Sequence, residues 1–206
     1  MPDIKENYYL VKDIYSYLEP FKKRKAGALS GGMKQKLALC CALIHKPDIL
    51  FLDEPTTGVD PVSRKEFWGM LRNLKEEGLS IIVSTPYMDE ASQCDYIALI
   101  RNGRFLDTDT PDNIISKFEY PLLAVNGEDM PGLLRTLREM PGVFSCYAFG
   151  DQHHVTMNDK ELTSEQAIGL IRMHLKEHNF NKLRIKAINP SIEDCYMYLD
   201  TLEGMK

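Results

Sequence analysis

The feature of this chain that most constrains its fold is a pair of sequence blocks near its amino end. The first, LSGGMKQKLAL, covers residues 29–39, and the second, ILFLDEPTTGVD, covers residues 49–60. Ser-Gly-Gly precedes a helix-forming segment, and the second block is an apolar run that stops at two carboxylates. We therefore expect a helix followed by a buried parallel strand, as in α/β proteins that bind ligands at the carboxyl ends of their strands.

The strand predicted at residues 49–52 ends at Asp53 and Glu54. A carboxylate in this place can hold Mg²⁺, and a neighbouring one can orient or deprotonate an attacking water. We predict Asp53 as a metal ligand and Glu54 as a catalytic base. The alternative is that Asp-Glu-Pro only ends the strand and opens a turn.

The Ser-Gly-Gly segment predicts an anion site at a helix start. Ser30 is a strong N-cap, and Gly31 and Gly32 allow the backbone to come close to a ligand. Free N–H groups and the positive end of the helix dipole favour a phosphate there. The alternative is an ordinary capped helix with glycines in its entry turn.

Together the two blocks, joined by a Lys-Pro-Asp break, resemble the ATP-binding cassette (ABC) family of transporter ATPases over roughly residues 10–118. The resemblance identifies residues 29–33 with the family's signature loop, 49–54 with its Walker B strand and 57–60 with its D-loop. It implies a partial P-loop NTPase fold of the α/β class that uses ATP and Mg²⁺. The nucleotide-binding residues so implied are Leu29, Ser30, Gly31, Gly32, Met33 and Asp60, beside the metal ligand Asp53 and the catalytic Glu54.

Two departures from the family pattern bear on activity. A histidine usually follows the Ser-Thr of the switch strand, and this chain has Pro86, which offers no donor. No G-x-x-x-x-G-K-[ST] motif (Walker A) occurs, and the 28 residues before Leu29 have a helical pattern. We therefore interpret the chain as the carboxyl half of an ABC ATPase, from a truncated gene, an incomplete reading frame or a split protein, and expect negligible ATP turnover by it alone.

The remainder of the chain predicts a second domain. We expect residues 1–117 to form the ATPase portion and residues 118–206 a small α+β, ferredoxin-like domain, because strand and helix patterns follow there in the order βαββαβ. Asn-Pro-Ser-Ile-Glu-Asp, at residues 189–194, resembles the tail of bacterial ABC-2 type exporter ATPases.

By this resemblance the chain is the ATP-binding subunit of an ABC transporter that couples ATP binding and hydrolysis to transport, more in keeping with export than import. Its implied partners are membrane permease subunits and a second ATPase subunit in a head-to-tail dimer, at the cytoplasmic face of the cell membrane. The alternative is a non-catalytic regulatory or interaction remnant of an ABC ATPase. Which substrate is transported is not encoded in these residues.

The composition argues against several other classes of protein. A net charge of −5 argues against general affinity for nucleic acid, and no stretch approaches the ~20 apolar residues of a membrane span. The five cysteines show no C-x-x-C spacing, so we expect reduced thiols in a cytosol.

Overall fold

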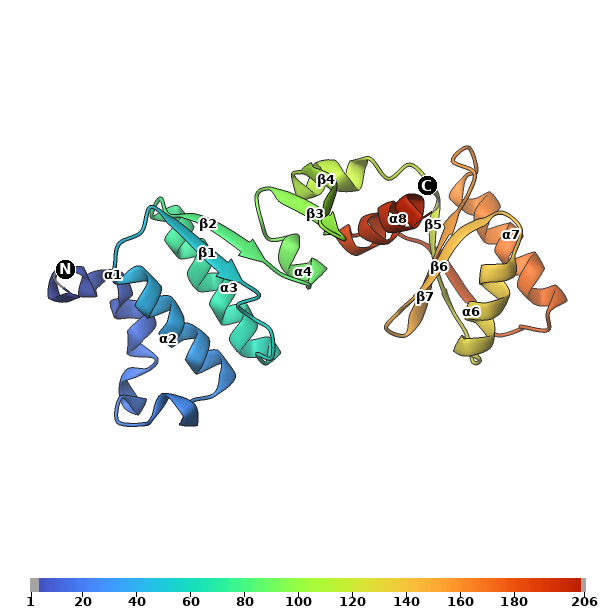
Figure 1. Ribbon diagram of the computed structural model, residues 1–206. Helices are drawn as coiled ribbons and strands as arrows, with labels where there is room; N and C mark the ends of the chain where they lie inside the picture. Colours follow the sequence, from blue (N-terminus) through green and yellow to red (C-terminus); the bar gives the residue numbers. More distant parts are fainter. Residues whose placement is uncertain (1–3, 205–206) are drawn as a thin grey trace. The chain divides into compact units, whose positions relative to one another are not determined.

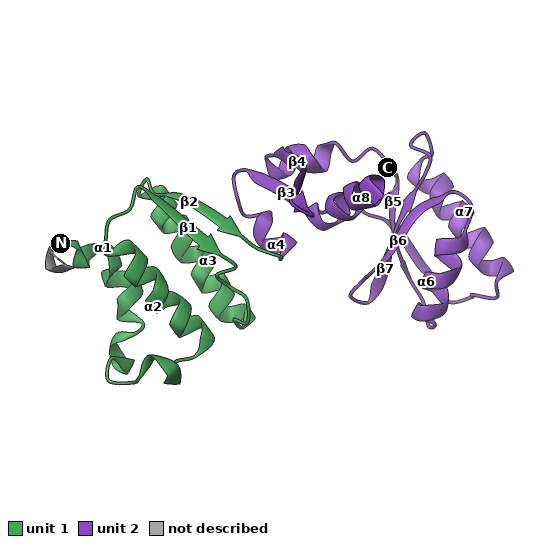
Figure 2. Cartoon of the chain, viewed as in Figure 1, with its two compact units in different colours: residues 1–86 green, residues 87–206 purple. Residues whose placement is uncertain are grey.

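A computed structural model describes residues 4–204 and shows a mixed α/β protein, as the sequence predicts. The chain divides into two compact units, one ending at Pro86 and one beginning at Tyr87 (Figures 1 and 2). The domain boundary predicted after residue 117 stays a prediction.

Unit 1 is a short parallel sheet with three α-helices. The strands pair in register from Ile49 with Ser80 to Asp53 with Ser84. In Figure 1, α3 lies between the strands and α2, and it contacts both β2 and α2. The elements are α1 (Ile4–Ser16), the 3₁₀ helices η1 (Glu19–Phe21) and η2 (Ala26–Ala28), α2 (Gly31–Leu43), β1 (Ile49–Asp53), α3 (Pro61–Glu76) and β2 (Ser80–Ser84).

The helices of unit 1 pack through apolar residues spaced three or four apart, the spacing that places side chains on one face of a helix. The buried members are Val11, Ile14, Leu39, Leu43, Phe67, Trp68, Leu71 and Leu74. A buried lysine also joins two helices, because Lys36 Nζ of α2 lies 2.6 Å from Glu66 Oε2 of α3. These contacts set the place of the α2 amino end.

The prediction that β1 is buried is wrong for one of its faces. Leu50 is buried, but Ile49 is 48% and Phe51 70% exposed. The side chains of a strand alternate between two faces, and within the described residues the face that carries Ile49 and Phe51 is left uncovered.

Unit 2 contains a four-stranded antiparallel sheet with the order β6-β7-β5-β8. The order β5-α6-β6-β7-α7-β8 confirms the predicted βαββαβ pattern. Helices α6 and α7 supply Leu133, Leu137, Ile171 and Leu175 to a core against the sheet. The elements are β5 (Leu122–Asn126), α6 (Met130–Glu139), β6 (Val143–Phe149), β7 (Gln152–Met157), α7 (Ser164–Glu177) and β8 (Arg184–Ala187).

The remaining elements of unit 2 form a second core around its last helix. They are α4 (Met88–Ala91), the antiparallel pair β3 (Ile97–Arg101) and β4 (Arg104–Asp109), α5 (Pro111–Ser116) and α8 (Ile192–Gly204). Ile192 and Cys195 of α8 pack with Leu99 and Ile114. Across residues 4–204, every helix is too short or too polar to cross a bilayer.

Candidate nucleotide and metal site

Asp53 lies at the carboxyl edge of the parallel strands of unit 1, as predicted. It is the last residue of β1, and its register partner Ser84 is the last residue of β2. The Ser84 hydroxyl donates a hydrogen bond of 2.5 Å to Asp53 Oδ1. Both residues are exposed, so the second carboxylate oxygen and the serine oxygen face a region that solvent and a cation can reach.

Glu54 is held in an unusual backbone conformation directly after the strand. Its φ is 43°, in the left-handed region that non-glycine residues rarely adopt. Its N–H donates to the Ser84 carbonyl and hydroxyl oxygens, each at 3.1 Å, and the Thr57 hydroxyl donates to Glu54 Oε2 at 3.1 Å. These bonds compensate the backbone strain and fix the direction of the carboxylate.

The predicted N-cap at Ser30 is confirmed. The Ser30 hydroxyl accepts a hydrogen bond of 3.3 Å from the backbone N–H of Met33, and α2 begins at Gly31. The first N–H groups of a helix have no partner inside the helix. The N–H groups of Gly31 and Gly32 therefore lack a partner inside the helix, and of the two residues Gly31 is exposed while Gly32 is buried.

The two glycines also serve a packing role that sequence reasoning missed. A Cβ added to Gly31 would lie 3.2 Å from the Gly58 carbonyl oxygen, and one added to Gly32 would lie 2.6 Å from Ser63 Cβ. The first turn of α2 thus packs directly against residues 58–63, here called the segment 58–63. The sequence predicts that the glycines bring the backbone close to a ligand, and the close approach within unit 1 is to this segment.

Asp60 caps the helix that follows. Its carboxylate accepts hydrogen bonds from the N–H groups of Val62 at 3.1 Å and Ser63 at 2.9 Å, at the start of α3. The backbone N–H of Ser63 is the main cause that lowers the pKa of Asp60. Asp60 therefore stays charged at neutral pH, and its direct contact with nucleotide remains a prediction.

The predicted residues thus belong to two groups within unit 1. Leu29 and Met33 flank the capped start of α2, which touches the segment 58–63. Asp53 and Glu54 lie at the strand edge. Thr57, which donates a hydrogen bond to Glu54, immediately precedes the segment 58–63 in the chain. Sequence reasoning missed the part played by Ser84, although the Ser-Thr pair at a strand end was a usable signal.

The oxygen atoms at this strand edge are of the type that Mg²⁺ binds, but they are few. Carboxylate and hydroxyl oxygens from Asp53, Glu54 and Ser84 are ligands that Mg²⁺ accepts, and the ion commonly retains several waters. Among the described residues no group of three or more His, Cys, Asp or Glu side chains could enclose a metal ion. A cation here would rely on one or two protein oxygens together with phosphate oxygens.

Comparison with known families gives a match to the model described as ABC transporter over residues 11–57. This range contains α2, β1 and most of the residues described above, but not the segment 58–63 or β2.

Curated relatives agree with this match. The chain is 52% identical over 83 residues to "Probable multidrug ABC transporter ATP-binding protein YbhF" of Escherichia coli, covering 40% of this chain and 14% of that protein. It is 41% identical over 130 residues to "Nod factor export ATP-binding protein I" of Burkholderia lata, covering 61% and 42% respectively. The chain therefore spans less than half the length of each of these relatives.

Among solved structures, cbiO1 from Clostridium perfringens, described as part of the ABC transporter complex cbiONQ, aligns with a TM-score of 0.48 and 28% identity. The alignment covers 55% of this chain and 47% of that one.

Proposed function

We propose that this chain, which carries an ABC transporter ATP-binding sequence, acts as part of the ATP-binding subunit of an ABC exporter. The observation that carries the proposal is the strand edge at which Asp53 and Glu54 are both held by Ser84. The relative named for Nod factor export supports export as the direction.

In this proposal each side chain at the strand edge has a separate task. Asp53, held by the Ser84 hydroxyl, offers its other oxygen to Mg²⁺, which would neutralise charge on the phosphates when bound. Glu54 accepts a proton from, or orients, the attacking water, and Thr57 keeps its carboxylate in place. The exposed position of both carboxylates lets water and nucleotide reach them.

The amino end of α2 is the proposed anion site. Ser30 and the N–H groups of Gly31 and Gly32 would bind the phosphates of a nucleotide held by a second ATPase subunit, in a head-to-tail dimer. The segment 58–63 supports the first turn of α2 from behind, so that its N–H groups keep their direction. Permease subunits would join this assembly at the cytoplasmic face of the membrane.

The second candidate function is a non-catalytic regulatory or interaction module. Pro86 favours it, because proline cannot supply the side-chain donor that the family usually places after the switch strand. No Walker A motif occurs within the 206 residues, so we also expect the purified polypeptide alone to turn over little ATP.

Glu54→Gln distinguishes the two candidates. The tagged chain is purified from detergent-solubilised membranes of its native host together with its bound partners, and Mg²⁺-dependent phosphate release is measured. Loss of a general base lowers the rate about 100-fold or more, so we expect that effect from Glu54→Gln. The control is Glu19→Gln, at an exposed residue of η1 whose carboxylate pairs with Lys22. Equal rates in wild type and Glu54→Gln would support the non-catalytic module instead.

A further inference from the structure

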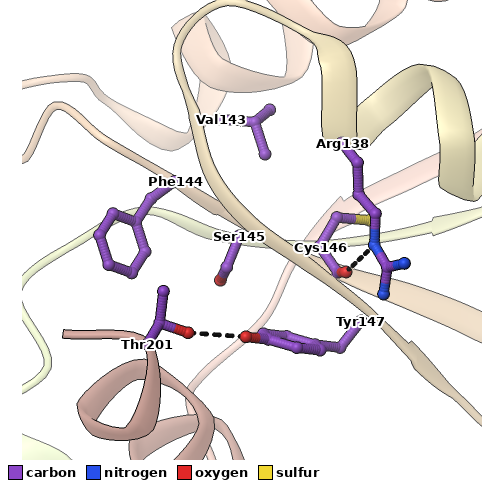
Figure 3. Close-up of a pocket in the computed structure, with 7 residues that line it drawn as sticks. All are labelled: Arg138, Val143, Phe144, Ser145, Cys146, Tyr147 and Thr201. Atoms are coloured by element: carbon purple, nitrogen blue, oxygen red, sulfur yellow. Dashed lines mark hydrogen bonds between the residues drawn. The ribbon is translucent and has the colours of Figure 1, made fainter. Parts of the chain in front are cut away.

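A pocket of about 280 Å³ opens at the free edge of the four-stranded sheet in unit 2 (Figure 3). Its wall is mainly β6, completed by one residue of α6 and one of α8. The lining residues are Arg138, Val143, Phe144, Ser145, Cys146, Tyr147 and Thr201. No acidic side chain is among them, and none of these residues belongs to the proposed nucleotide site.

Arg138 reaches this edge from the last turn of α6. Its Nε donates a hydrogen bond of 3.0 Å to the Cys146 carbonyl oxygen, as Figure 3 shows. That bond fixes the plane of the guanidinium and leaves the two terminal nitrogens to other acceptors. In the part of the chain that the structure describes, no ion pair involves Arg138.

The edge strand adds a backbone donor beside this guanidinium. Phe149 and Gln152 flank a two-residue turn, so they form a hydrogen-bonded pair, as do Tyr147 and His154 two residues further along. Beyond Tyr147, the next pair joins Cys146 with Val155, and this pair is not hydrogen-bonded, so the Cys146 N–H and carbonyl point away from β7. The bond from Arg138 to the Cys146 carbonyl agrees with this direction.

The hydroxyl groups complete the pocket. Thr201 donates to the Met197 carbonyl at 2.8 Å, so the 2.6 Å contact between Tyr147 and Thr201 is donated by Tyr147. Within the described chain the Ser145 hydroxyl makes no hydrogen bond. The pocket therefore presents a guanidinium, a backbone N–H and a hydroxyl that can all donate.

The opposite part of the lining is apolar. Val143 and Phe144 are half-exposed, and the Phe144 ring lies 5.2 Å from that of Tyr198 and stacks at 6.4 Å with that of Tyr120. This aromatic cluster holds the ring as a fixed wall. A ligand with both a charged and a flat apolar part would match the two sides of the pocket.

We propose that this pocket binds a small organic carboxylate, with its carboxylate on Arg138 and its apolar body against Phe144 and Val143. A carboxylate is favoured over a phosphate because one guanidinium balances a single charge, whereas a phosphate monoester carries about −1.5 to −2. The bound molecule contacts both β6 and α8. Asp200, next to Thr201, accepts a 2.6 Å hydrogen bond from Arg101 of β3 through its carbonyl, so the site adjoins the second core of unit 2.

Benzoate and its uncharged analogue benzamide test the proposal on the complete chain. We expect benzoate to shift the backbone amide NMR signals of residues 144–147 and 201 with saturation in the millimolar range, and benzamide to bind roughly tenfold more weakly. Arg138→Gln should weaken benzoate by about the same factor without changing benzamide. The control Arg135→Gln alters an exposed arginine of the same helix outside the pocket.

Ser145→Leu fills the pocket while leaving Arg138 in place. This variant provides an independent test of binding if Arg138→Gln disturbs the edge strand. It should abolish the benzoate shifts. The proposal is overturned if benzoate and benzamide bind equally, if the shifted signals lie elsewhere, or if Ser145→Leu binds benzoate like the wild type. Since no nucleotide is used, these outcomes do not depend on the proposed ATPase role.

Discussion

At the scale of single residues, Gly32 makes the sharpest prediction about unit 1. A Cβ at this position would lie 2.6 Å from Ser63 Cβ and 2.7 Å from its Oγ. Because the first turn of α2 or α3 must shift to admit it, we expect Gly32→Ala to lower the free energy of unfolding by about 1–3 kcal/mol. Urea unfolding followed by fluorescence of Trp68, the single tryptophan, reports on this unit.

The same change at Gly27 is the matched control, because a Cβ there meets nothing within 4 Å. Ser63→Gly removes the atoms that clash, so the double variant with Gly32→Ala should recover most of the lost stability. A Gly32→Ala protein as stable as the Gly27→Ala protein would contradict the packing role of the glycine.

The cysteines provide a second prediction at the residue scale. Burial raises the pKa of Cys40 to about 11 and the pKa of Cys146 to about 12, whereas Cys41 is exposed. A raised pKa keeps a thiol protonated between pH 7 and 9, and only the thiolate reacts quickly. We expect the exposed Cys41 to react with a disulfide reagent such as DTNB well before Cys40 or Cys146.

Cys41→Ser should remove this early reaction, which liquid chromatography with mass spectrometry can assign to a residue. Labelling of Cys40 or Cys146 at the rate of Cys41 in the folded protein would show that these thiols are open to solvent.

At the scale of elements, α8 is joined to the sheet of unit 2 by a buried carboxylate. Asp194 accepts a 2.7 Å hydrogen bond from His154 Nδ1 of β7 and also accepts from the N–H and hydroxyl of Ser191. Burial alone would raise the pKa of Asp194, but the hydrogen bonds from His154 and Ser191 outweigh it and lower the pKa below its usual value. This carboxylate therefore has two roles: it helps to cap α8, and it attaches α8 to the sheet.

The lowered pKa of Asp194 determines how its contribution to stability changes with pH. A lowered pKa in the folded state means that Asp194 stabilises the protein above its unfolded pKa of about 3.9, and that the gain is lost as pH falls through the folded value. We expect Asp194→Asn to cost about 1.5–3 kcal/mol at pH 7 and progressively less below pH 4. Thermal unfolding at several pH values measures the difference, with the exposed Glu193→Gln as the control.

Local patterns in the sequence predict the elements well because side-chain periodicity and caps act within a few residues. The βαββαβ order, the cap at Ser30 and the strand that ends at Asp53 all follow from such patterns. The contact of Gly32 with Ser63 and the left-handed backbone of Glu54 do not, since they depend on residues that meet only after folding.

At the scale of the whole molecule, the role of α8 bears on where the chain can be divided. The sequence predicts a domain starting at residue 118, but the compact units separate at Pro86. Ile192 and Cys195 of α8 are each 2% exposed, and they pack against Leu99 and Ile114, which lie before residue 118. A chain of residues 118–206 would expose that apolar face of α8 to water.

We therefore expect residues 87–206 to fold alone with a single cooperative transition, and residues 118–206 to bind a hydrophobic dye such as ANS and melt without one. The two polypeptides share the complete sheet β5–β8, so the difference between them isolates the core around α8. Ile192→Asp in the longer polypeptide places a charge in the same core and should reproduce the behaviour of the shorter one. If residues 118–206 melt as sharply as residues 87–206, then α8 is held by the sheet alone and the predicted boundary after residue 117 marks an independent folding unit.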